Sequence, residues 1–165
     1  LHKSSHSFPT RRSSDLFEEA EFYADRSLKI YPEYLSANQI KSGLVAERYL
    51  VHKNLPQLLS EFTTILMARP QVEYVQQFMA YLNGREDQQR LVDFYYKTGY
   101  ELFSKQRGLH PMAITYLKLG EQIAPNDPRI LFGLGKAFYN GGDQVQGTKY
   151  LERAYAINPS LRDTN

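Results

Sequence analysis

The stretch 128–161, PRILFGLGKAFYNGGDQVQGTKYLERAYAINPSL, shows the repeating pattern of this chain most clearly. It holds two runs in which apolar residues recur three and four positions apart, which is the period of an amphipathic helix. Gly141 and Gly142 separate the two runs, and Pro159 follows the second. Glycine and proline in these places end a helix and turn the chain. The stretch therefore predicts two antiparallel helices, at 128–140 and 144–157.

Small residues stand where these two helices would cross. Gly135 lies in the first run and Gly147 in the second. Glycine lowers the stability of a helix by about 1 kcal/mol relative to alanine, so two glycines at paired positions indicate a close approach of the backbones. Asp127 is placed to cap the first helix, and Pro128 suits its first turn, where no amide hydrogen is needed.

The stretch resembles a tetratricopeptide repeat, a unit in which a turn joins two antiparallel helices. With Pro128 as position 1, the signature positions of that family fall on Leu134, Gly135, Phe138, Gly147, Leu151, Ala154 and Pro159. The family prefers alanine at position 20, where this chain has Gly147. The resemblance implies an all-α solenoid of antiparallel helix pairs, a tetratricopeptide-like superhelix of about four repeats with partial ends.

The preceding unit, 94–127, fits the same register best in its second half, where Ala113 and Pro125 occupy positions 20 and 32. Further upstream the spacing of the closing prolines slips, so the exact register over 35–93 is left open. The periodicity predicts nine helices, at 17–31, 35–52, 56–68, 71–82, 86–97, 99–107, 111–123, 128–140 and 144–157. Thr98 and Gly99 are expected to break or bend a long helix.

The N-terminal stretch 1–16 differs from the rest of the chain. Its greater part, HSFPTRRSSDL at 6–16, resembles a translated sequencing adapter, and we expect 1–16 to be a disordered artefact. The repeat domain then covers 17–165 and is expected to be truncated at both ends: the helix at 17–31 would be the second of an incomplete pair, and 160–165 would begin a further helix. Because the natural start would be missing, the sequence predicts no compartment.

The resemblance also implies a binding surface on the first helix of each pair. The groove-facing positions of the family fall on Arg129, Phe132, Lys136, Tyr139 and Asn140 in the last unit, and on Tyr95, Thr98, Leu102, Lys105 and Gln106 in the preceding one. Phe132 and Tyr139 would anchor a peptide, and the two cations would favour acidic partners. The alternative interpretation of these side chains is a solvated face. The lysine and asparagine that clamp a terminal carboxylate in some members are absent from the last unit.

The sequence shows no catalytic motif. It has no cysteine, and neither His52 nor His110 pairs with a second histidine or a carboxylate at ligand spacing. Outside the stretch 1–16 the basic and acidic side chains balance, which weighs against nucleic-acid binding. No apolar run is long enough to cross a membrane. We therefore expect no cofactor, no metal and no enzyme activity in this chain.

The predicted function is a scaffold that binds a peptide or partner protein in the concave groove of the array. The alternative is a helical accessory region of a larger enzyme or of a membrane or envelope-assembly protein. A catalytic motif or a membrane span elsewhere in the gene would favour that alternative.

Overall fold

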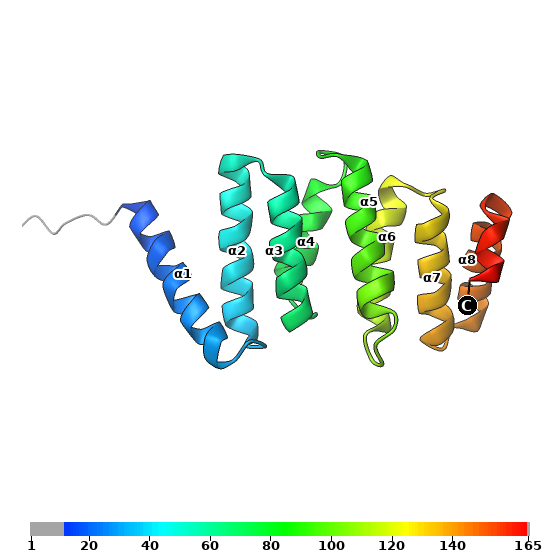
Figure 1. The fold of residues 1–165 in the computed structure, drawn as a ribbon, viewed down its shortest axis with the longest axis horizontal. Coiled ribbons are helices and arrows are strands. Elements are labelled where there is room, and N and C mark those ends of the chain that lie inside the picture. Colours follow the sequence, from blue (N-terminus) through cyan, green and yellow to red (C-terminus); the bar gives the residue numbers. More distant parts are fainter. Residues whose placement is uncertain (1–11, 165) are drawn as a thin grey trace, which may run out of the picture.

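Eight α-helices follow one another through residues 12–164, the part of the chain that the computed structural model describes (Figure 1). They are α1 (Ser13–Ile30), α2 (Leu35–His52), α3 (Leu55–Ala68), α4 (Glu73–Leu82), α5 (Gln88–Tyr96), α6 (His110–Ile123), α7 (Pro128–Asn140) and α8 (Gln144–Ile157). A π-helical segment, η1 (Lys97–Phe103), continues α5, and a short 3-10 helix, η2 (Pro159–Asp163), follows α8. No strand occurs in the described residues. The predicted all-α class is confirmed.

The helices form a two-layered row. Most successive helices pack closely, namely α1 with α2, α2 with α3, α5 with α6, α6 with α7 and α7 with α8. Helices two apart also contact each other: α2 with α4, α4 with α6, and α5 with α7. Figure 1 shows α3, α5 and α7 in front of α4, α6 and α8. We call α3, α5 with η1, and α7 the front layer. This arrangement confirms the predicted solenoid of helix pairs.

Side-chain caps fix the starts of several helices. The carboxylate of Asp127 accepts hydrogen bonds from the backbone nitrogens of Arg129 (2.9 Å) and Ile130 (3.3 Å), as the sequence predicts. Asn54, Asp87 and Asp143 cap α3, α5 and α8 in the same way. These bonds satisfy amides that have no partner within the helix.

The predicted division into two helices at Thr98 and Gly99 is wrong, and a π-helical segment is found at this place instead. The backbone stays helical through Lys97 (φ −61°, ψ −45°), so 86–97 and 99–107 are not two helices but parts of one continuous helical segment. Gly99 instead makes room for α6, because a β-carbon there would lie 2.5 Å from Cγ of Leu117. The glycine serves close packing between helices, which overrides its weak helix propensity.

This merger lowers the number of helices. In the described residues eight helices replace the predicted nine. Among the upstream helices, α2 contacts α1, α3 and α4.

Both ends of the described region also differ from the prediction. Helix α1 begins at Ser13, inside the stretch expected to be disordered, and the Asp15 carboxylate caps it by accepting a hydrogen bond from the Arg12 backbone nitrogen (3.3 Å). The rest of that stretch, 1–11, lies outside the described residues. At the other end η2 replaces the predicted helix, and Leu161 packs against the core.

One apolar core runs from α2 to α8, and α1 is attached mainly by ion pairs. Lys41 of α2 bonds Glu21 (2.8 Å) and Asp25 (2.9 Å) of α1, and Arg48 bonds Glu21 (2.6 Å). Ala24 is the one fully buried apolar residue of the described part of α1. The docking of this helix therefore depends on charge more than the docking of the others.

Acid should loosen α1 before the rest of the fold. The hydrogen bond from Lys41, assisted by Arg48, lowers the pKa of Glu21. A carboxylate whose pKa is lowered by folding stabilises the folded state at pH values above its unfolded pKa of about 4.3. That stabilisation is lost as the pH falls through the folded pKa. We expect the amide NMR signals of α1 to move towards unfolded positions as the pH falls below the unfolded pKa of about 4.3. In Glu21→Gln that pH dependence should be shallower, and an equal dependence in both proteins would contradict the assignment.

Candidate functional site

A groove separates α3 from α5 and η1 in the front layer. Two adjoining cavities of about 300 and 340 Å³ are lined by these elements. Thr63, Phe94 and Lys97 border both cavities, so the cavities form one continuous groove. Figure 1 shows the ribbons of α3 and α5 standing apart, with α4 behind them. We call it the α3–α5 groove.

The α3 wall of the groove carries no charge. Its residues recur about one helical turn apart, so they form a single stripe along the helix: Pro56, Leu59, Ser60, Thr63 and Met67. The side chain of Met67 is largely exposed, at 67%. A stripe of apolar and hydroxyl groups of this kind favours contact with another apolar surface.

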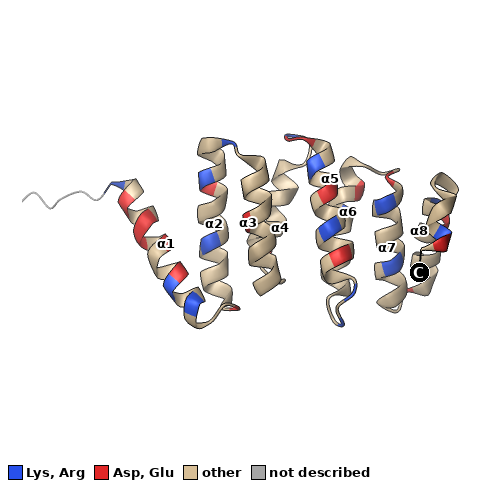
Figure 2. Ribbon diagram, in the orientation of Figure 1, with Lys and Arg blue, Asp and Glu red and all other residues tan. Residues whose placement is uncertain are grey.

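The opposite wall is charged. Arg90, Asp93, Lys97 and Glu101 follow one another along α5 and η1, and Figure 2 shows the alternation of basic and acidic segments on this helix. Asp93 is bound by Arg129 of α7 (2.9 Å), and Arg90 makes only a long contact with Asp87 (3.6 Å). Lys97 is exposed and forms no ion pair within the described part of the chain.

Tyr95 and Phe132, two of the predicted groove residues, are buried among the helices, and Thr98, on the wall of the α3–α5 groove, is also buried. The hydroxyl of Tyr95 points into the core, where it lies within hydrogen-bonding distance of the Met79 carbonyl oxygen (3.0 Å). Phe132 is 4% exposed and packs edge-on against Tyr100 of η1, with ring centres 5.5 Å apart. Both side chains join helices of the solenoid.

The predicted cations also make contacts within the protein. Arg129 bonds Asp93 and lies 5.5 Å from the centre of the Tyr96 ring, so it ties α7 to α5. Burial would lower the pKa of Arg129, but the bonds to carboxylates raise it overall. Lys136 lies over the ring of Phe132 at 5.4 Å, and Lys105 lies over that of Tyr100 at the same distance.

The remaining predicted groove residues divide into two groups. Thr98 and Leu102 line the α3–α5 groove. Tyr139, Asn140 and Gln106 are exposed but border none of the groove's cavities. From the sequence we assigned no binding role to α3, although Leu59, Thr63 and Met67 recur four residues apart and could have indicated its stripe.

The residues of the repeat signature lie at helix contacts. A β-carbon on Gly147 would lie 2.8 Å from the Gly135 carbonyl oxygen, so the predicted close approach of the two glycines is confirmed. Gly135 itself faces Leu151, and Phe138 stacks on Tyr150 with ring centres 5.6 Å apart. Fully buried members are Leu134, Ala154 and Ala113. Pro159 opens η2, and the carbonyl of Pro125 accepts a hydrogen bond from Arg153 (3.3 Å).

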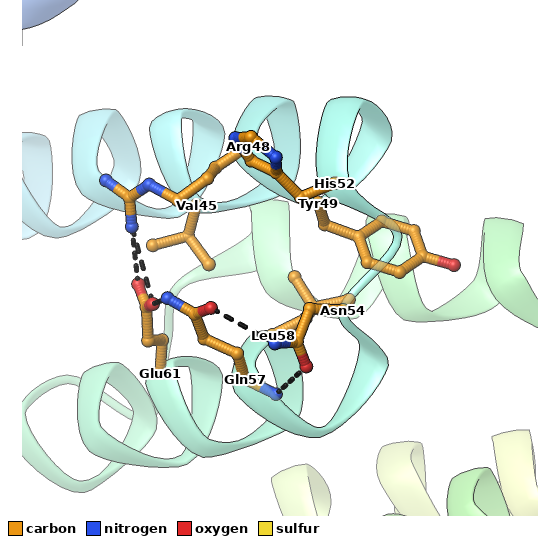
Figure 3. A pocket seen from close by; sticks show the side chains of 8 residues that line it. All are labelled: Val45, Arg48, Tyr49, His52, Asn54, Gln57, Leu58 and Glu61. Carbon is orange, nitrogen blue, oxygen red and sulfur yellow. Dashed lines mark hydrogen bonds and ion pairs between the residues drawn. The ribbon is translucent and has the colours of Figure 1, made fainter.

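A second hollow, between α2 and α3, is nearly filled. Figure 3 shows Arg48 paired with Glu61 across it, and Asn54 capping the backbone at Gln57. Its volume is about 10 Å³, roughly the space of one water molecule. His52 lines this hollow without a partner that would make it a metal ligand. The hollow therefore fits neither a substrate nor a peptide.

Neither a metal site nor a membrane span is found in the described region. No three histidine, aspartate or glutamate residues gather as a metal site in residues 12–164, and none of the helices there is long and apolar enough to cross a bilayer. No protein-family profile and no curated protein sequence matches the chain. A function is therefore inferred from the fold and from the α3–α5 groove.

Proposed function

We propose that the protein is a helical-repeat scaffold of the tetratricopeptide type, which binds a segment of a partner protein in the α3–α5 groove. The observation that supports this is the continuous groove between an uncharged wall and a charged wall. Apolar side chains of a bound segment would be buried on the α3 wall, and the charges on α5 would set its orientation. The alternation of charge along α5 and η1 is unlike the unbroken basic track that binds a phosphate backbone.

The test fills the groove with a large side chain. Peptides that bind the wild-type protein are selected from a random displayed library. Their dissociation constants are then measured for the wild-type protein and for Thr63→Trp, which places an indole between the walls. We expect the dissociation constant of most selected peptides to rise by about tenfold or more. If the library yields no binder, the scaffold proposal is wrong.

A matched control is available on the other layer. Thr115 of α6, like Thr63, is a partly buried helical threonine whose hydroxyl donates to the carbonyl four residues earlier. Thr115→Trp makes the same chemical change away from the groove and should leave peptide binding unchanged. Equal losses in both variants would show that the selected peptides bind elsewhere.

A further inference from the structure

Resting on this proposed function, we propose that the natural occupant of the α3–α5 groove is an amphipathic α-helix of the partner, aligned with α3 and α5. It would carry two carboxylates seven residues apart, against Arg90 and Lys97. The bound helix would complete the front layer between α3 and α5.

The shape of the groove favours a helix. The wall residues run along both helices, from Pro56 to Met67 on one side and from Arg90 to Glu101 on the other. Eleven residues of helix rise about 16 Å, so an occupant of roughly three turns would span the groove. Stripes at helical spacing are also what one helix presents to another when they pack side by side.

The neighbouring contact in the same layer shows what such a stripe does when it is covered. On its other side, α5 with η1 meets α7 directly: Asp93 pairs with Arg129, and Tyr100 packs against Phe132. The charge pair and the apolar contact lie about two turns apart along α5 and η1, and the contact of Arg129 with the Tyr96 ring lies between them. The α3–α5 groove offers the same kinds of group without a covering helix.

Charge specifies the partner further. Lys97 borders both cavities and has no ion pair in the described region, and Arg90 lies seven residues, or about 10 Å, before it. Asp93, between these cations, is already bound by Arg129 and so repels an incoming carboxylate less. Acidic residues one heptad apart on the occupant would therefore face two cations.

The apolar part of the groove sets the remaining positions. Leu59, Met67 and Phe94 contribute to the walls between and beside the charges. An occupant with leucine three and four residues after its first carboxylate would place both leucines against these side chains. The unbranched Met67 side chain adapts to different apolar shapes.

The experiment uses three fluorescent synthetic peptides of about 18 residues, a length that forms five turns. The first is alanine-rich, with glutamate at positions i and i+7 and leucine at i+3 and i+4. The second has lysine in place of both glutamates, and the third has a proline in the middle of the first. Fluorescence anisotropy should show the first binding at least about tenfold more tightly than the other two.

Charge reversal on the protein tests the contact directly. Lys97→Glu should weaken binding of the glutamate peptide by about fivefold to tenfold and strengthen binding of the lysine peptide. The matched control is Lys149→Glu, an exposed lysine of α8 far along the chain from the groove, which should change neither affinity. Equal effects of the two variants would overturn the assignment of Lys97.

Failure of this inference is distinguishable from failure of the scaffold proposal. If the proline peptide binds as tightly as the first, or if no synthetic peptide binds below about 1 mM, the helical occupant is wrong. Library peptides whose binding is blocked by Thr63→Trp would still support the groove as a docking site. If the helical peptide does not bind and Thr63→Trp does not block the library peptides, both proposals are wrong.

Discussion

Replacing Gly147 with alanine should destabilise the protein by about 1 to 3 kcal/mol. A β-carbon at this position would lie 2.7 Å from the Tyr139 backbone nitrogen and 2.8 Å from the Gly135 carbonyl oxygen. Both atoms belong to the backbone of α7, so no side-chain rotation relieves the clash. Helices α7 and α8 would have to move apart, which would weaken the contacts of Leu151 and Tyr150 between them.

This expectation opposes two simpler ones. Helix propensity favours alanine over glycine by about 1 kcal/mol. The tetratricopeptide family, which this stretch resembles, also has a preference for alanine at this position. Gly43 of α2 provides the matched control, because a β-carbon there meets only the Tyr74 ring, at 3.9 Å. Gly43→Ala should therefore stabilise by about 0.5 to 1 kcal/mol. Thermal unfolding followed by circular dichroism measures both, and a stabilised Gly147→Ala would show that the two helices are less closely packed.

The local signals in the sequence were enough to predict most helices. The bounds of α7 and α8 agree with the prediction because an aspartate cap, a proline and a pair of glycines mark their ends. Gly99 misled the prediction because a glycine in a helical run either ends the helix or makes room for a neighbour. Only the position of Leu117, on the next helix of the chain, decides between these roles.

The binding surface was harder to predict than the fold. The groove-facing positions of the family predicted a binding role for Arg129 and Phe132 of α7. In the structure Arg129 pairs with Asp93 of α5, and Phe132 packs against Tyr100 of η1. The groove depends instead on the separation of α3 from α5, which are far apart in the contact pattern of the fold: α5 contacts α6 and α7, and α3 contacts α2. The spacing of the closing prolines slips in this same region, so the resemblance gave no register for α3.

Removing the hydroxyl group should have different effects on stability at two buried tyrosines, Tyr95 and Tyr116. Tyr95 and Tyr116 are both fully buried, and burial raises the pKa of both phenols, so both stay neutral. The Tyr95 hydroxyl lies 2.5 Å from Oδ1 of Asn83, whose amide nitrogen in turn donates to the carbonyl of Leu119 (3.0 Å). The Tyr116 hydroxyl has no hydrogen-bond partner in the described part of the chain.

Tyr95→Phe should therefore destabilise by about 1 to 2 kcal/mol, because it leaves the side-chain oxygen of Asn83, the nearer acceptor, without its donor. Tyr116→Phe should be neutral or slightly stabilising, because it removes a buried hydroxyl that forms no bond. The two changes delete the same atom from equally buried rings, so the difference between their unfolding free energies in urea reports the hydrogen bonds alone. Equal losses would mean that the Tyr116 hydroxyl has a partner, such as a buried water, and would contradict the proposed difference between the two sites.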